Sequence, residues 1–501
     1  MFSRRTMLAA MAGTAATATA TGCSAGSTAT QDGRLRDSGI VVGATTAPAS
    51  LDFTNTGGAA IPQALMGNVF ETLVRIDADG HLVGHLATAY ELSDDGLTYT
   101  FHLREGVRFS NGDAFTAFSA AATIDYVRTS WTNALKSQMA PVQRAWAVDD
   151  ATLKVELRKP SNRWLWTMAT LTGAMMTPNA WPAGATAPVG TGPYTVSRFV
   201  ALESVSFARN PDYWGPPAAA DAAIRYYSDA MSAVNGLLTG DVDVLYGMPS
   251  PELLASLPQR FTVDVGTTNG EVLLSMNNQA APFDDVRVRR AVAHAIDRRA
   301  VSNVVWEGHA VDTGAAPVPP TDPWFSGRDY APYSPATARD LLREAGYPDG
   351  AGPRVAMTVP SLPYAEACAE LVYSQLRDVG FEVEMTTVEF PAVWLAQVMG
   401  AADYQMSIIA HVEFRDLPTL FGNPEGYLRF DDARTRALLD LADTTDDETE
   451  HMLAAVERIT DLMPAVTVAN LPNIVLLAPG VSGVQATVIT DSIPLAGLRK
   501  E

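Results

Sequence analysis

The residues best suited to chemistry lie in two short stretches of this sequence, "HLVGH" (81–85) and "HVEFRDLP" (411–418). The first has two histidines four residues apart, a spacing that could hold zinc on a helix. It lacks the glutamate of the H-E-x-x-H motif and contains a glycine, so a zinc helix is not expected. The second stretch places His411, Glu413 and Asp416 at the end of a predicted strand. A single histidine is a poor metal site and the spacing offers no second ligand, so no metal is predicted.

Catalytic motifs give no support to an enzyme. The sequence has no Walker loop, and no S-x-x-K accompanied by its companion motifs. Cys368 lies in an apolar helical pattern, "YAEACAELVYSQL", and is expected to pack as a small core residue. We therefore expect a protein that is not an enzyme and that needs no cofactor.

Composition narrows the class further. The chain has 501 residues, a formal net charge of −21 and a pI near 4.7. Nucleic-acid affinity comes mainly from lysine and arginine neutralising phosphates, so no nucleic-acid partner is expected. The hydrophobic share of 47% is that of an ordinary globular protein with enough apolar residues for more than one core.

The first residues are typical of an export signal. Arg4 and Arg5 precede a weakly apolar run of small residues that ends in "ATGC", which predicts a twin-arginine type signal over residues 1–22. Cys23 then follows the pattern of a bacterial lipobox and is expected to be acylated and to anchor the protein to the outer face of the cell membrane. Residues 23–38 are small and polar and predict a flexible tether. No later run is long enough for a membrane span.

The remaining chain must supply the elements that position these groups. Residues 97–103, "LTYTFHL", alternate strictly and predict a half-buried strand with Tyr99, Phe101 and Leu103 facing a core. Thr116 is expected to cap the helix that follows. "NRWLWTM", which contains two tryptophans, is expected to belong to the core as well.

The second half of the sequence has a different pattern. Asp297 and Ser334 are suited to begin helices, and Pro335 follows as a first helical residue. Residues 354–411 then alternate strand, helix, strand, helix and strand. That order predicts an α/β unit with a largely parallel sheet.

Six stretches in order carry a resemblance to a known family. They are "HLVGHLATAYELSDDGLTYTFHLREGVRFSNGDAFTA" (81–117), "TGPY" (191–194), "RNPDYWG" (209–215), "LLTGDVDV" (237–244), "MNNQAAPFDDVRVRRAVAHAIDR" (276–298) and "ARDLLREAGY" (338–347). Together they resemble the extracytoplasmic solute-binding proteins of peptide- and nickel-type ABC importers, family 5. One departure is Ser119, where the family usually has an acid after the glycine turn.

The resemblance implies an α/β fold of two lobes, like that of periplasmic binding proteins, with a hinge and an extra α+β subdomain on the first lobe. The expected division assigns residues 39–78, 187–270 and 478–501 to lobe I, 79–186 to its subdomain and 271–477 to lobe II. The resemblance also implies that the lobes close on a small solute, most simply a peptide, and present it to a membrane permease with its ATPase.

The same resemblance implies where the ligand would be held. Peptide-binding members use an acid after a second-lobe strand to pair with the ligand's α-amino group. The expected ligand-binding residues are Thr46, Ala47, Phe53, Phe390, Trp394, His411, Glu413 and Asp416. A nickel chelate or another solute, and a sensing or chaperone-like role on the same fold, remain open alternatives. The protein is expected to be a monomer.

Overall fold

A computed structural model of the chain describes residues 39–501, apart from 78–79, 184–186 and 349. The predicted signal, the tether and Cys23 lie outside the described residues. Within that part of the chain, no helix combines the length and apolar character that a membrane crossing requires.

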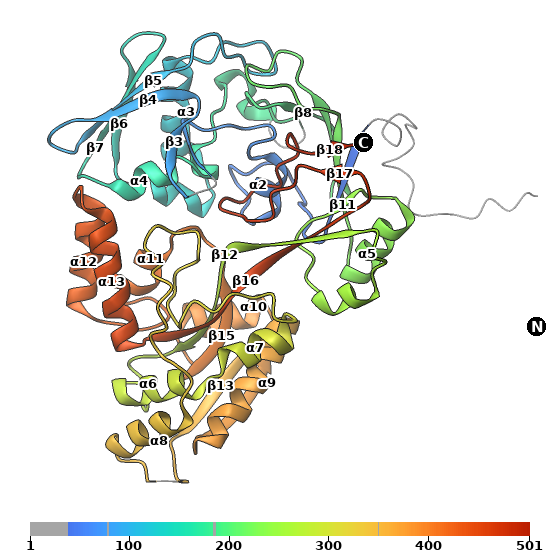
Figure 1. Cartoon of the computed structure of the whole chain (residues 1–501). Coiled ribbons are helices and arrows are strands. Elements are labelled where there is room, and N and C mark those ends of the chain that lie inside the picture. The colour runs from blue at the N-terminus through green and yellow to red at the C-terminus, as the bar shows by residue number, and fades with distance from the viewer. Residues whose placement is uncertain (1–38, 78–79, 184–186, 349) are drawn as a thin grey trace, which may run out of the picture.

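One large sheet runs through both lobes and joins them (Figure 1). Its strands, in spatial order, are β14 (Glu382–Val388), β13 (Arg354–Pro360), β15 (Met406–His411), β12 (Thr262–Met276), β16 (Ala465–Leu477), β11 (Val244–Leu245), β1 (Ile40–Ala44), β10 (Ala222–Tyr226), β9 (Ser204–Arg209) and β8 (Tyr194–Val200). The strands before β12 belong to the lower lobe of Figure 1 and those after β16 to the upper one.

The long antiparallel strands β12 and β16 form the connection between the lobes. Residues 262–267 of β12 pair with 472–477 of β16, and residues 271–275 pair with 465–470, with a shift of register between the two blocks. The first block lies beside β11 and the second beside β15. The chain therefore crosses between lobes near residues 268–270 in β12 and near 471 in β16, which is earlier in β16 than the predicted boundary at 477.

A separate four-stranded sheet forms the core of the subdomain. Its order is β4 (Ala87–Leu92), β5 (Thr98–Leu103), β7 (Thr152–Leu157) and β6 (Val142–Ala147), all antiparallel. Tyr99, Phe101 and Leu103 are buried, as the alternation predicted, because one face of the sheet packs on helix α3 (Ala117–Ser130) and on the buried ring of Trp164. Two small antiparallel sheets, β2 (Val74–Ile76) with β3 (Leu82–Gly84) and β17 (Val481–Ser482) with β18 (Arg499–Lys500), complete the strands of the described chain.

The helices cover the sheets and fill the space beside them. They are α2 (Ala60–Leu65), α4 (Asn162–Thr167), α5 (Ala230–Thr239), α6 (Val286–Ala295), α7 (Arg298–Val305), α8 (Pro335–Glu344), α9 (Pro363–Asp378), α10 (Ala392–Trp394), α11 (Leu417–Phe421), α12 (Ala433–Thr444) and α13 (Glu448–Leu462). The predicted two-lobed α/β fold with its subdomain is confirmed.

The predicted helix caps are present. Thr116 accepts a hydrogen bond from the backbone N–H of Ser119, and the Ser119 hydroxyl accepts one from the N–H of Thr116. The serine thus completes a capping box at the position where the resemblance implies an acid. Asp297 caps α7 by accepting a hydrogen bond from the backbone N–H of Ala300. Ser334 caps α8 by accepting one from the N–H of Thr337, with Pro335 in the first turn.

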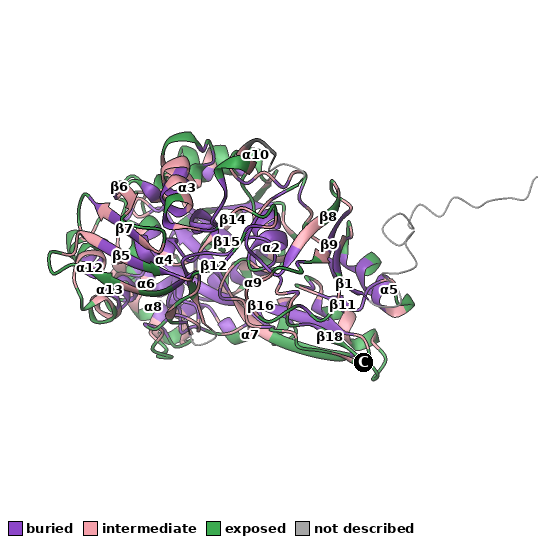
Figure 2. Ribbon diagram, turned by 90° about the horizontal axis from the view of Figure 1, so that it is seen from above, coloured by how far each residue is buried: buried purple, intermediate pink, exposed green. Residues whose placement is uncertain are grey.

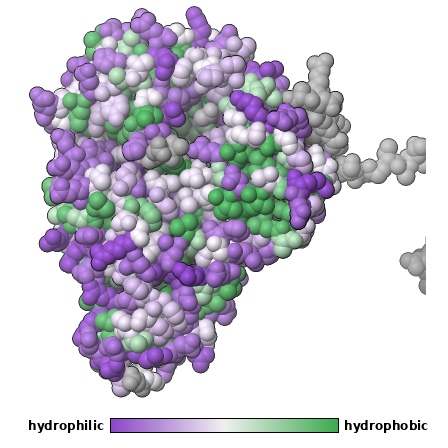
Figure 3. Space-filling view, in the orientation of Figure 1, coloured by the Kyte–Doolittle hydropathy of each residue, from purple (hydrophilic) through white to green (hydrophobic). Residues whose placement is uncertain are grey.

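Buried residues gather along the central strands, and exposed residues lie on the outer surface (Figure 2). Cys368 is fully buried in the lobe II core, as expected, and burial raises the pKa of its thiol to about 12. The face shown in Figure 3 is largely hydrophilic, with a hydrophobic area over the region of α5, where Met231 is exposed.

The end of the chain returns to the first lobe. The Ser492 hydroxyl donates to the carbonyl of Met66, and the backbone N–H of Leu495 donates to Oδ1 of Asn68. Asn68 is fully buried and donates to the carbonyl of Ile493 as well. The last residues of the chain are therefore part of the lobe I core.

Candidate ligand cavity

A cavity of about 790 Å³ lies between the two lobes. Such a volume falls within the roughly 300–1,000 Å³ range of small-molecule sites. The lining comes mainly from residues 57–77 of lobe I, 133–138 and 159–171 of the subdomain, 412–452 of lobe II and 485–494 of the returning C-terminal segment. The cavity is therefore assembled only when all of these parts meet.

The three polar residues predicted after the second-lobe strand lie together. His411, Glu413 and Asp416 each offer a ligand atom, and these atoms lie within 4.8 Å of one another. Of the three, Glu413 lines the cavity. Nδ1 of His411 is 3.9 Å from Oδ2 of Asp416, and its Nε2 is 2.7 Å from the hydroxyl of Tyr427. Burial lowers the pKa of His411, so its ring is neutral at physiological pH.

Two further carboxylates, neither of them predicted, belong to the same region. Asp491, in the returning C-terminal segment, also lines the cavity and is exposed to it. The surrounding protein atoms and the nearby charge of Glu413 raise its pKa to about 6. The same two causes raise the pKa of Asp416 to about 8. Glu271 lies opposite His411 in the β12–β15 pairing, and burial raises its pKa well above the ordinary value. No lysine or arginine of the described chain forms an ion pair with Glu271, Glu413, Asp416 or Asp491.

Arg415 was not predicted as a site residue, and it lies between these acids and the subdomain. Its guanidinium carbon is 3.1 Å from the centre of the Trp166 ring and 4.3 Å from that of Trp324. Its side chain is only 8% exposed and pairs with Asp322, with Nε 3.1 Å from Oδ1. Within the described chain, Nη1 of Arg415 and Nε1 of Trp324 have no hydrogen-bond partner, and both residues line the cavity. Two buried donors thus lie at the cavity wall.

The backbone conformation at Arg415 is unusual for a residue other than glycine. Its φ of 51° lies in the left-handed region, which a non-glycine residue adopts at a cost. Arg415 lies in the connection between the end of β15 at His411 and the start of α11 at Leu417. Glu413, Phe414 and Arg415 of this connection all line the cavity.

The two tryptophans of "NRWLWTM" have different places. Trp164 is buried in the subdomain core, as expected. Trp166 lines the cavity instead and donates from Nε1 to Oε2 of Glu448 in lobe II, at 3.2 Å, so its predicted core position is wrong. Two residues apart on a helix, the side chains point about 200° apart, and that spacing could have separated them.

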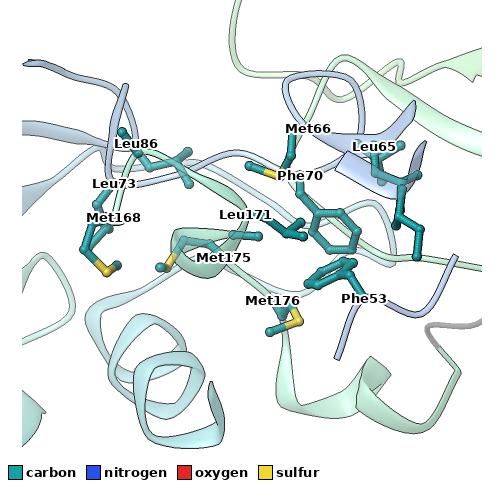
Figure 4. Packing of buried hydrophobic residues seen from close by; sticks show 14 of the residues in the cluster. Phe53, Leu65, Met66, Phe70, Leu73, Leu86, Met168, Leu171, Met175 and Met176 are labelled. Atoms are coloured by element: carbon teal, nitrogen blue, oxygen red, sulfur yellow. The ribbon is translucent and has the colours of Figure 1, made fainter. Parts of the chain in front are cut away.

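The predicted aromatic residues do not line the cavity. Phe53 is 3% exposed and packs edge-on against Phe70, with ring centres 5.0 Å apart, in the lobe I core (Figure 4). Trp394 is 2% exposed and donates from Nε1 to the hydroxyl of Ser407. Phe390 packs beside Trp394 in the same lobe II cluster. These side chains bury more apolar surface in the cores than at a wet cavity wall, which corrects the expectation.

The loop residues Thr46 and Ala47 are also outside the lining. Thr46 is exposed, and Ala47 packs against the lobe I core. The lobe I lining comes from residues 57–77 instead, which follow that loop. Of the eight residues predicted to bind the ligand, the structure places Glu413 at the cavity, with His411 and Asp416 directly behind it.

Several of the sequence stretches that carry the family resemblance meet at one buried carboxylate on the cavity wall, that of Glu71. Glu71 accepts hydrogen bonds from Thr191 of "TGPY", and from Tyr213 and Trp214 of "RNPDYWG". Nε2 of His85, from "HLVGH", lies 3.2 Å from it. These hydrogen bonds join segments of lobe I, and the contact of His85 adds the subdomain, so the motif residues hold these two parts together at the cavity wall.

The comparisons with known proteins agree on one family. The model of the bacterial extracellular solute-binding proteins, family 5 (middle region), matches residues 81–421, which is more than half of the chain. The glutathione-binding protein GsiB of Salmonella typhi is 30% identical over 339 residues, which is 66% of this chain. GsiB of Escherichia coli O1:K1 / APEC is 29% identical over the same length. The chain spans 65% of the length of these curated relatives.

Solved structures show the same fold. NikA from Brucella suis, in complex with Fe(III)-EDTA, has a TM-score of 0.80 at 22% identity, over 92% of this chain and all of that one. DppA from Helicobacter pylori, in complex with the peptide STSA, has a TM-score of 0.74 at 24% identity, over 92% of this chain and 98% of that one. With the family model matching most of the described chain, this protein belongs to the bacterial extracellular solute-binding proteins of family 5.

Proposed function

We propose that this protein captures a small solute in the cavity between its lobes and delivers it to the membrane permease of an ABC importer. Family membership supports the role of solute capture, and the cavity between two lobes gives the ligand a place. The predicted permease and ATPase are partners under this proposal. A binding protein of this kind catalyses no reaction, which agrees with the lack of catalytic motifs.

The ligand we propose is a solute with an ammonium group, most simply a short peptide. The observation that carries this choice is the gathering of Glu413, Asp416 and Asp491 without an ion-pair partner of opposite charge among the described lysines and arginines. Carboxylates with raised pKa values gain from any cation placed among them. Glu413 and Asp491 reach the cavity and would take the ammonium group.

The same ligand would also need a hydrogen-bond acceptor near its ammonium group. Nη1 of Arg415 and Nε1 of Trp324 are donors without a described partner at the cavity wall. A peptide carbonyl or carboxylate would satisfy them after a shift of these two side chains, because both nitrogen atoms are buried, whereas a purely cationic amine would leave them unpaired. Glutathione, for which GsiB is named, and the peptide STSA, with which DppA was solved, carry both kinds of group.

A thermal-shift screen tests the proposal. The chain from residue 24 onward would be screened against dipeptides, longer peptides, glutathione, nickel–histidine complexes and oligosaccharides. A ligand at a hundred times its dissociation constant adds about 2.7 kcal/mol of stability. We expect stabilisation by peptide-like compounds, with calorimetry giving the affinity. A response only to oligosaccharides, or to none of the classes, would refute the proposed ligand.

A metal chelate is the second candidate, because one observation favours it. His411, Glu413 and Asp416 have ligand atoms within 4.8 Å, and the neutral His411 ring is the form that coordinates a metal. Solved structures of the same fold hold Fe(III)-EDTA and Ni(L-His)2. If the chelate is the ligand, nickel with histidine should stabilise the protein more than any peptide does. His411→Gln should abolish that response while peptide binding stays unchanged.

Cys23 is proposed as the membrane anchor. The lipobox-like "ATGC" and the preceding basic residues support an acylated Cys23 after signal cleavage. Radiolabelled palmitate incorporated in cells should label the protein, and Cys23→Ser should remove the label and release the protein from the membrane fraction. Label retained in the Cys23→Ser variant would contradict the anchor.

A further inference from the structure

Helix α4 of the subdomain meets helix α12 of lobe II on the side of the molecule away from β12 and β16 (Figure 1). Residues of both helices line the cavity. The two segments are about 280 residues apart in sequence and are joined by side chains that reach across in both directions. These contacts lie where the lobes face each other, so they depend on how the lobes are placed.

From lobe II, Asp443 serves the start of α4. Its Oδ1 accepts hydrogen bonds from the backbone N–H of Arg163, at 2.9 Å, and from the hydroxyl of Ser161, at 2.8 Å. Ser161 itself caps α4 by accepting from the N–H of Trp164. The N–H of Arg163 lies in the first turn of α4, where no acceptor exists within the helix, so Asp443 is its partner.

From the subdomain, Asn162 serves the end of α12. Its Nδ2 donates to the carbonyl of Ala442 at 2.9 Å and to that of Thr445 at 2.6 Å. Carbonyls in the last turn of a helix have no intrahelical partner and need an outside donor. Each helix therefore gives the end of the other an additional hydrogen-bond partner, and neighbouring residues on the two segments make the exchange.

Two more contacts belong to the same surface. The Trp166 indole donates to Glu448 of α13, and Nη2 of Arg163 donates to the hydroxyl of Thr419 at 3.1 Å. Arg163, Trp166, Asp443 and Glu448 all line the cavity. On this side of the cavity, the residues that make the contact between the subdomain and lobe II also line the cavity.

We propose that the reciprocal caps between Asn162 and the end of α12, and between Asp443 and the start of α4, form a latch that retains the bound solute and sets its rate of release. Retention rests on the proposed function, but the latch is a property of the chain and can be measured without a ligand. Opening the lobes would leave the Arg163 N–H and the two α12 carbonyls to water. Replacing a cap residue with alanine typically changes such an equilibrium by about two- to thirty-fold.

Hydrogen exchange at the Arg163 amide tests the latch directly. Exchange is followed by mass spectrometry with fragmentation to single residues, on the ligand-free protein. In the unmodified protein this amide should be protected, although its helix offers it no acceptor. Asn162→Ala leaves Asp443 in place, so faster exchange in this variant reports opening of the lobes. We expect the rate to rise about two- to thirty-fold. Asp443→Ala should raise it at least as much.

Two controls keep the result interpretable. Asp446→Ala changes an exposed acid three residues after Asp443 that bonds to nothing in α4, and it should leave exchange at Arg163 unchanged. Amides of β5 should stay protected in every variant, which shows that the subdomain remains folded. An unprotected Arg163 amide in the unmodified protein, or an unchanged rate in Asn162→Ala, would overturn the latch.

A second arm measures retention with a compound found in the thermal-shift screen. Stopped-flow tryptophan fluorescence gives its dissociation rate, and Asn162→Ala should raise that rate two- to thirty-fold while the association rate changes little. Equal dissociation rates would overturn the role in retention. If the screen finds no compound, the proposed ligand fails, while the exchange experiment still decides whether the latch exists.

Discussion

The two sides of the cavity differ in whether the fold supplies partners for their polar and charged groups. At the latch, Asp443 accepts hydrogen bonds from two donors and Asn162 donates to two carbonyls, so the described partners satisfy each group. At the end of β15, Glu413 and Asp491 face the cavity without a cationic partner among the described residues. Under the two proposals above, the polar groups that the fold itself satisfies serve closure, and those that it leaves unsatisfied receive the ligand.

Arg415 lies between these two sides, and removing its partner should have the largest effect. Asp322→Ala would leave a buried guanidinium unpaired, and we expect the free energy of unfolding to fall by about 3–5 kcal/mol. Urea unfolding at pH 8, where Asp322 with its pKa of about 6 is ionised, measures this loss. The double variant Asp322→Ala/Arg415→Met should recover most of it. A loss below about 1 kcal/mol would show that the pair is not buried in solution.

Glu413→Gln tests the unsatisfied side. The substitution keeps the size of the side chain and removes the charge, so the affinity for an ammonium-bearing ligand should fall at least about tenfold, or 1.4 kcal/mol. Calorimetry on the compound from the screen measures it. Asp416→Asn should act in the same direction. Glu425→Gln, which changes an exposed glutamate on the same lobe, is the matched control. Unchanged affinity in both cavity variants would rule the pairing out.

The pH dependence sharpens the same point. A carboxyl whose pKa is raised by folding holds its proton more tightly in the folded protein, so the stability it contributes is lost as the pH rises from about 4. A cationic ligand favours the ionised carboxyl, and its affinity should therefore increase with pH. With the pKa of Asp491 at about 6, the expected gain between pH 5 and 7 is up to about tenfold. Affinity that falls or stays constant over this range would contradict the ammonium site.

The surface of the latch should give the smallest effect. Lys159 and Asp440 form an ion pair at 3.4 Å, but their side chains are 58% and 68% exposed. An exposed pair contributes at most about 1 kcal/mol and is screened by salt. At high salt, where this ion pair is screened, Lys159→Ala should therefore leave exchange at the Arg163 amide within about twofold of the unmodified rate, in contrast to Asn162→Ala. A larger effect would show that the exposed ion pair, rather than the helix caps, holds the latch closed.

The sequence predicted local structure better than the site. The alternation around Phe101 and the cap at Thr116 follow from rules that act within a few residues, and both are confirmed. The cavity depends on contacts between distant segments, and no local pattern shows that Asp491 would lie near Glu413. Aromatic residues such as Trp394 carry no mark that separates a core from a cavity wall. Arg415 is exceptional because its environment, rather than its type, makes it part of the site.

The buried side-chain amide of Asn68 implies an order in which the two lobes of this protein fold during synthesis. Its hydrogen bonds to Ile493 and Leu495 join residues more than 420 positions apart. A ribosome that has completed lobe II has still not supplied these partners, so lobe I must wait for the last segment before its core can close. Lobe II contains a single continuous run between β12 and β16 and can fold earlier. The solute cavity, which takes lining residues from the same last segment, is therefore among the final features to form.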